Sequence, residues 1–162
     1  IVNSFSKTFA MTGWRIGYII SSNLEAMSQI TKMQYYITAC SNDAMQYAVL
    51  AAMEEASDYP EIIAKEFKER CDLIVDRLNQ MPGVECHKPK GAIYVFPKVH
   101  VDGMSSEEIA LELLKDGVLC SPGSAFGPSG EGHLRFAYTI SKDDISLGMD
   151  KVEATLKRLN GL

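Results

Sequence analysis

One short stretch near the start of the sequence, residues 4–18, concentrates side chains that could do chemistry. Lys7 and Arg15 lie eight residues apart, and the hydroxyls of Ser4 and Ser6 stand beside the lysine. A lysine becomes a covalent catalyst when its neutral amine attacks a carbonyl, and roughly one free lysine in two thousand is neutral at pH 7. Burial or nearby positive charge raises that fraction. Arginine and serine side chains can in turn hold a phosphate. An amine that traps an aldehyde, next to a phosphate anchor, is what pyridoxal phosphate requires.

The residues around this stretch predict the elements that position it. Apolar pairs before and after it, Ile1–Val2 and Ile19–Ile20, indicate two strands that carry the functional loop between them. Asn23 is a suitable N-cap for a helix that runs to about Ile37. The next helix, about residues 44–56, is apolar nearly all the way round. Such a helix is expected to be buried in a larger body or in a subunit interface.

A long helix follows, and it separates two differently patterned regions. Pro60 suits the first turn of a helix, because its missing N–H would have no partner there. Apolar residues then recur at helical spacing as far as Met81, and Gly83 is expected to end the helix. The segment is therefore interpreted as a connector between two domains.

The region beyond Gly83 alternates between strand and helix patterns. Strands are predicted over residues 84–87, 92–96, 118–120 and 133–138. Ser105 with Glu108 forms a capping-box pattern, and Ser141 is a second N-cap, so a helix is predicted after each serine. Four strands with helices outside them indicate a small two-layer α/β domain.

Composition narrows the function further. The net charge is −5 and the pI is about 5.2, so no basic surface favours nucleic acid, and no apolar run is long enough to span a membrane. The four cysteines are widely scattered and the histidines sit at no ligand spacing near them, so neither a metal site nor a disulfide framework is expected. Reduced thiols indicate a cytoplasmic protein.

The motifs together carry a family resemblance. Ser-x-Ser-Lys followed by Ala-Met-Thr-Gly-Trp-Arg-Ile-Gly-Tyr closely resembles the active-site signature of class I/II aminotransferases, enzymes of the aspartate aminotransferase fold (fold type I). The resemblance continues, in the expected order, through residues 91–96, 122–127 and 134–138. It covers essentially all 162 residues.

The resemblance implies an activity and roles for five residues. Lys7 would be the lysine that forms a Schiff base with pyridoxal phosphate and later carries a proton. Ser4, Ser6 and Arg15 match the positions that hold the phosphate, and Arg135 matches the arginine that binds the α-carboxylate of the amino acid. The implied protein is a transferase of amino acid metabolism and biosynthesis, a homodimer that moves an amino group between an amino acid and a 2-oxo acid.

The resemblance corresponds only to the C-terminal part of such an enzyme. Residues 1–57 would be a remnant of the large cofactor-binding domain, residues 58–83 the connecting helix and residues 84–162 the small C-terminal domain. Because the chain opens with Ile1, directly at the chemistry, we expect a fragment or a proteolytic remnant. The acid for the pyridine nitrogen, the stacking aromatic ring and the backbone phosphate cradle lie upstream of the lysine in this family. We therefore expect the isolated chain to be inactive.

Three alternatives remain open. Another enzyme of the same fold, a lyase, racemase or synthase, would use the same lysine. A non-catalytic binding or dimerisation module would keep only the fold. Residues 4–7 also fit the S-x-x-K nucleophile motif of β-lactamases, but the S-D-N and K-T-G triplets of that chemistry are absent. No arginine lies near Ser41–Asn42, which disfavours one route to dicarboxylate specificity.

Overall fold

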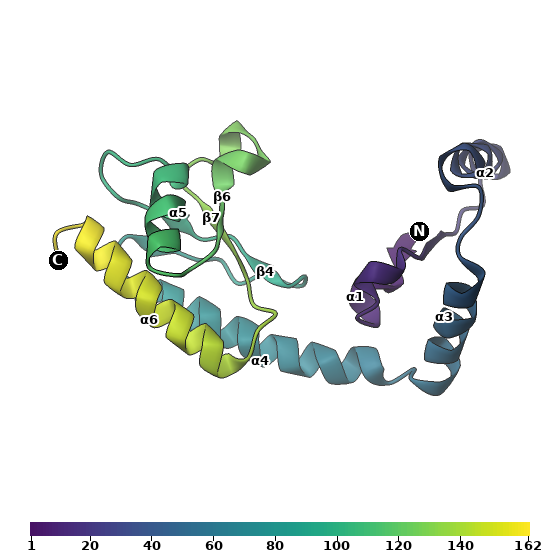
Figure 1. Ribbon diagram of the computed structural model, residues 1–162, viewed down its shortest axis with the longest axis horizontal. Coiled ribbons are helices and arrows are strands. Elements are labelled where there is room, and N and C mark those ends of the chain that lie inside the picture. The colour runs from purple at the N-terminus through teal and green to yellow at the C-terminus, as the bar shows by residue number, and fades with distance from the viewer. The chain divides into compact units, whose positions relative to one another are not determined.

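A computed structural model describes all 162 residues, which form two compact units, Ile1–Ile63 and Ala64–Leu162 (Figure 1). The first unit contains β1 (Val2–Ser4), α1 (Phe5–Thr8), η1 (Thr12–Trp14), β2 (Gly17–Ile19), α2 (Leu24–Thr38) and α3 (Asp43–Glu55). The helix α4 (Tyr59–Asn79) runs from the first unit into the second. The second unit continues with β3 (Val84–Glu85), β4 (Tyr94–Val95), β5 (Lys98–Val99), α5 (Ser106–Lys115), β6 (Ser121–Pro122), η2 (Gly123–Phe126), η3 (Pro128–Gly130), β7 (Leu134–Ala137) and α6 (Lys142–Leu159). The chain is thus a mixed α/β protein.

The first unit begins with an antiparallel hairpin whose long connection carries α1 and η1. Val2 pairs with Ile19 and Ser4 pairs with Gly17. Val2 and Ile19, one from each apolar pair of the sequence, thus lie in two paired strands, as predicted. A Cβ on Gly17 would lie 2.6 Å from the backbone oxygen of Asn3, so only glycine lets the strands approach this closely.

The helices α2 and α3 both begin at asparagine caps. The side chain of Asn23 accepts a hydrogen bond from the Ala26 backbone, and Asn42 accepts one from Met45. Val49 is the buried residue of α3. Three other large apolar side chains of α3 and several on α2 are exposed: Met33, Tyr35, Tyr36, Ile37, Tyr47, Leu50 and Met53. The expectation that a larger body or a subunit buries α3 therefore stays a prediction.

The second unit contains the main hydrophobic core. Its three-stranded antiparallel sheet has the order β4-β7-β6, and a separate pair joins β3 to β5. The helix α5 packs against β6 and against α6 (Figure 1). The side chains that are almost completely enclosed come from both helices and sheet: Ile74, Leu78, Val95, Ile109, Leu113, Leu134 and Val152. Burial of these side chains is the dominant favourable contribution to the folding of the unit.

Both serine caps of this unit form as predicted. The Ser105 hydroxyl accepts from the Glu108 backbone while the Glu108 carboxylate accepts from the Ser105 backbone, which completes the capping box. The Ser141 hydroxyl accepts from the backbone of Asp144 at the start of α6. No helix of the chain combines the length and the apolar composition that crossing a membrane requires.

Three expectations about the second unit are wrong in detail. Residues 118–120 form no strand, because no strand pairs with them; the pairing begins at β6, where Ser121 lies opposite Arg135. Residues 84–87 and 92–96 are shorter strands than predicted, and each pairs with a different partner, β5 and β7. Finally, α4 ends at Asn79, so Gly83 serves a later turn in which its φ is +77°.

Candidate active site

The hydroxyls of Ser4 and Ser6 lie together at the start of α1. Ser4 is the N-cap of this helix, and its Oγ accepts a hydrogen bond of 3.1 Å from the Ser6 backbone N–H. The same Oγ donates to Ser6 Oγ at 2.9 Å. The extended backbone of Ser4 at the end of β1 makes this cap possible. The two hydroxyl groups are thus held together at the start of the helix that carries the lysine.

Lys7 lies in α1 with its side chain exposed and makes no ion pair or side-chain hydrogen bond. The helix itself is anchored by Phe5, which is buried and whose ring lies 5.5 Å from the ring of Tyr18 and 6.1 Å from that of Phe9. Because Phe5 fixes the helix, the backbone of Lys7 is held while its amine stays available to a ligand.

Arg15 has a strained backbone. Its φ of 54° and ψ of 50° place a non-glycine residue in the left-handed region, and it lies directly after η1. The Arg15 guanidinium donates through Nη1 to the Thr12 backbone oxygen at 3.0 Å. A single hydrogen bond to a neutral acceptor leaves the charge of the guanidinium uncompensated. Strain of this kind is often found at functional sites.

The donor set of the first unit fits the phosphate and aldehyde of pyridoxal phosphate. It offers two serine hydroxyls, one guanidinium and one amine, and no carboxylate forms an ion pair with either cation. A phosphate needs hydroxyl and guanidinium donors, and an aldehyde needs a free amine. Ser4, Ser6, Lys7 and Arg15 are therefore the residues that could hold this cofactor.

Arg135 belongs to the second unit, where β7 positions it between the buried residues Leu134 and Phe136. Its Nη2 donates to the hydroxyl of Ser121 at 3.2 Å, across the β6–β7 pair. Its Cζ lies 4.6 Å from the ring centroid of Tyr94 and 4.6 Å from that of Phe126. The guanidinium is therefore a partly buried cation that stacks on two aromatic rings.

Arg15 and Arg135 differ from the other arginines of the chain. The remaining three arginines each pair with acids: Arg70 with Glu66, Arg77 with Asp150 and Glu153, and Arg158 with Glu112 and Asp116. Neither Arg15 nor Arg135 has a carboxylate partner within its unit. Both guanidinium groups are thus free to take an anionic ligand.

Reasoning from the sequence missed two residues of this site, Tyr94 and Phe126. Both lie in segments that carry the family resemblance, residues 91–96 and 122–127, but the sequence assigns neither of them a role. Tyr94 pairs with Ala137, so it lies diagonally across the strands from Arg135 on the same sheet face. The register of β4 on β7 would have indicated this neighbour, but no local pattern in the sequence specifies that register.

Comparison with known proteins places the chain in a family. The family model described as aminotransferase class I and II matches residues 1–152. An aspartate aminotransferase of Pyrococcus horikoshii is 41% identical over 160 residues, which are 97% of this chain and 41% of that protein. The aromatic-amino-acid aminotransferase 2 of Thermococcus litoralis is 36% identical over 96% of this chain and 40% of its own length.

A solved structure agrees with these matches. The crystal structure of an aromatic aminotransferase from Pyrococcus horikoshii OT3 superimposes with a TM-score of 0.88 at 38% identity, over 97% of this chain and 42% of that one. The chain therefore spans about two fifths of the length of the relatives it matches. The family uses pyridoxal phosphate. The match over residues 1–152 and the agreement in structure establish that this chain belongs to the aminotransferase class I and II family.

Proposed function

We propose that the native protein is a transaminase that moves an amino group between an amino acid and a 2-oxo acid with pyridoxal phosphate held at Lys7. The observation that carries the proposal is the donor set of the first unit: a lysine amine without a hydrogen-bond partner, two serine hydroxyls bonded to each other, and an arginine without a carboxylate partner. Membership of the family supports it. The relatives include enzymes named for aspartate and for aromatic amino acids, and the specific substrate is left open between them.

The residues of the chain have distinct roles in this proposal. Ser4, Ser6 and Arg15 hold the phosphate, and Lys7 Nζ bonds to the aldehyde carbon. When bound, pyridoxal phosphate supplies an electron sink for the negative charge that develops at Cα of the amino acid. The amino group of the substrate would displace Lys7 Nζ from the aldehyde carbon, and the freed amine would then accept the proton that leaves Cα. Arg135 binds the α-carboxylate through parallel N–H donors and so orients the amino acid.

We also propose that the chain corresponds to the C-terminal portion of the longer relatives. Residues 1–57 would belong to the large domain, residues 58–83 to the connecting helix and residues 84–162 to the small domain. The division into compact units near residue 63 supports this arrangement. We expect residues 1–162 alone to be inactive, because the resemblance assigns no pyridine acid and no stacking ring to them.

Two further properties complete the proposal. A homodimer is supported by the exposed apolar side chains of α2 and α3, which a partner subunit would cover. A cytoplasmic location in amino acid metabolism is supported by the four free cysteines, of which Cys71 and Cys86 are buried.

The proposal is tested by trapping the cofactor on the lysine. The native protein is incubated with pyridoxal phosphate, reduced with borohydride and digested, and the modified peptide is identified by mass spectrometry. We expect the label on Lys7, and we expect Lys7→Ala to lower turnover by at least about 10²-fold. Lys32→Ala, a change at an exposed lysine of α2, is the matched control and should leave both results unchanged. A label elsewhere, or near-normal turnover of Lys7→Ala, would contradict the proposal.

A further inference from the structure

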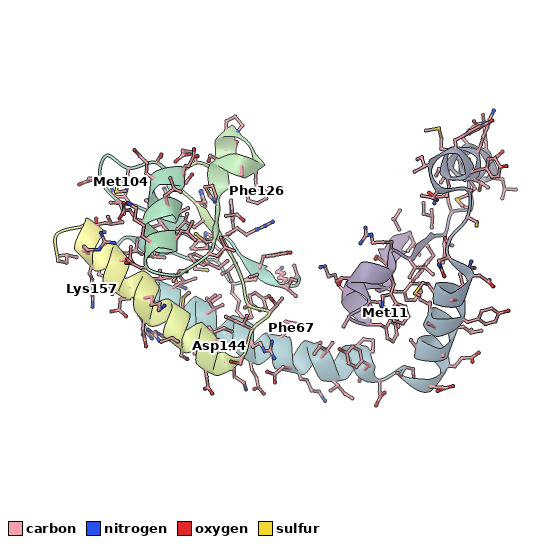
Figure 2. The ribbon with its side chains drawn as sticks, in the orientation of Figure 1. Met11, Phe67, Met104, Phe126, Asp144 and Lys157 are labelled. Carbon is pink, nitrogen blue, oxygen red and sulfur yellow. The ribbon has the colours of Figure 1, made fainter.

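Two aromatic rings lie against the guanidinium of Arg135. The rings of Tyr94 and Phe126 each lie 4.6 Å from Cζ, a distance typical of a cation–π contact. Tyr94 comes from β4. Phe126, which Figure 2 labels, comes from the η2 turn, far away in the sequence. Phe126 is 52% exposed, so it contributes little to the hydrophobic core of its unit. A large exposed ring that stacks on a cation indicates a role other than core packing.

The turn that carries Phe126 is fixed by a close backbone crossing. A Cβ on Gly123 would lie 2.0 Å from the backbone oxygen of Gly130, and one on Gly130 would lie 2.0 Å from that of Gly123. The Gly123 N–H also donates to the backbone oxygen of His133 at 2.7 Å. Only glycine at both positions allows the crossing. The two ends of the turn are therefore held against each other.

A second set of contacts ties this loop to the start of α5. The Glu131 carboxylate accepts from the backbone N–H of Ser106 at 2.6 Å and from its hydroxyl at 3.0 Å. The Ser106 hydroxyl in turn accepts from the backbone N–H of Ser124 at 3.4 Å. Ser106 is 1% exposed and Glu131 is exposed, so these hydrogen bonds join a buried side chain to the surface of the unit. They restrict the movement of Phe126 relative to the sheet that carries Arg135.

We propose that Tyr94 and Phe126 are positioning residues that hold the guanidinium plane of Arg135 in the orientation needed to bind a carboxylate. The inference rests on the proposed function, in which Arg135 binds the α-carboxylate of the amino acid. Contact with two rings limits how far the guanidinium plane can turn. All N–H donors of arginine point in that plane, and Nη2 already donates to Ser121. The remaining in-plane edge is presented to two carboxylate oxygens at once.

The stacking matters because a free arginine side chain is flexible. Holding it in one orientation before the ligand arrives removes part of the ordering cost of binding, so affinity rises without new contacts to the ligand. The benefit applies equally to the ground state and the transition state, since the carboxylate does not react. Loss of a ring should therefore raise KM and leave kcat nearly unchanged.

The test replaces each ring in the native protein and measures amino-acid kinetics. Phe126→Leu and Tyr94→Leu should each raise KM about 3- to 10-fold and change kcat less than about 2-fold. Both variants should weaken inhibition by 3-phenylpropionate, an unreactive carboxylate, by a similar factor. Phe126→Tyr and Tyr94→Phe keep an aromatic ring and should restore both values. An unchanged KM in the leucine variants, or no restoration by the aromatic variants, would overturn the inference.

Two further variants make the outcome decisive. Phe67→Leu removes a ring that lies 5.2 Å from Cζ of Arg70 on α4, away from Arg135, and should leave KM unchanged. Arg135→Lys keeps the charge and loses the fork, so it should raise KM more than either leucine variant does. If Arg135→Lys leaves KM unchanged, the proposed carboxylate site and the inference both fail. If Arg135→Lys raises KM while Phe126→Leu and Tyr94→Leu leave it unchanged, the inference fails and the proposed function stands. If Phe126→Leu does not fold, Tyr94→Leu and Tyr94→Phe still test whether an aromatic ring positions Arg135.

Discussion

Replacement of Gly123 by alanine should strongly destabilise the second unit, because the added methyl group has no room. The new Cβ would lie 2.0 Å from the Gly130 backbone oxygen and 2.7 Å from that of His133. The first distance is about 1 Å inside the shortest separation that Cβ atoms normally show. The neighbouring atoms are backbone, so no side chain can rotate away. The strand β7 or the η3 turn must shift to admit the methyl group.

The cost follows from two contributions. Forcing a methyl group into a packed site typically costs about 1–3 kcal/mol. The shift also weakens the 2.7 Å hydrogen bond from Gly123 to His133, and an internal hydrogen bond contributes roughly 1 kcal/mol. We therefore expect the free energy of unfolding to fall by about 2–4 kcal/mol. For a unit of this size each kcal/mol corresponds to roughly 4–8 °C, so Tm should fall by on the order of 10 °C or more.

The assay is thermal and urea unfolding of the native protein, followed by circular dichroism. Gly148→Ala is the matched control, because a Cβ on Gly148 meets no atom within 4 Å. Gly148 lies inside α6, where alanine is favoured over glycine by roughly 0.5–1 kcal/mol, so the control should be stabilised. If Gly123→Ala lowers the free energy of unfolding and Gly148→Ala raises it, the destabilisation comes from the steric clash and not from the exchange of glycine for alanine as such. A Gly123→Ala protein as stable as the parent would refute the close backbone crossing.

Two further predictions concern the capping contacts at the start of α5. Backbone and hydroxyl hydrogen bonds from Ser106 hold the pKa of Glu131 below its ordinary value of 4.5. Glu131 therefore stabilises the folded state above pH 4.5, and this contribution is lost as the pH falls through the pKa of the folded state. Urea unfolding at a series of pH values should therefore show a smaller loss of stability below pH 4.5 in Glu131→Gln than in the parent, and equal losses would contradict the assignment. Ser105→Ala removes the capping-box hydroxyl and should cost about 1 kcal/mol, read as a Tm lower by roughly 4–8 °C, whereas Ser129→Ala in the exposed η3 turn should change nothing; equal melting of the two variants would argue against the cap.

The elements of this fold that could be predicted from the sequence are the ones with local causes. Asn23, Ser105 and Ser141 each cap a helix with a side chain that reaches only two or three residues along the chain. The strands depend instead on partners far away. Residues 118–120 have an apolar pattern but no paired neighbour, and β4 pairs with β7 although about forty residues separate them. Such pairing is decided by tertiary packing, which a local pattern does not contain.

The candidate site also has one part that the sequence could indicate and one part that it could not. Ser4, Ser6, Lys7 and Arg15 lie within twelve residues of one another, so residue types and spacing are enough to propose them as one site. The surroundings of Arg135 were not predictable, since its three contacts come from β4, β6 and the η2 turn. The sequence could indicate that an arginine lies in an apolar strand. It could not indicate that two aromatic rings contact this arginine.

The arginines of both units differ in whether they have a carboxylate partner. Arg70, Arg77 and Arg158 are each paired with acids, which compensate the charge of the guanidinium. Arg15 and Arg135 are the exceptions, and each is held without a carboxylate: Arg15 by a backbone oxygen, and Arg135 by a hydroxyl and two rings. These supports fix the position of a guanidinium without neutralising its charge. A protein that binds two anionic groups, a phosphate and a carboxylate, needs cations in that state, because an internal ion pair would have to break before either anion could bind.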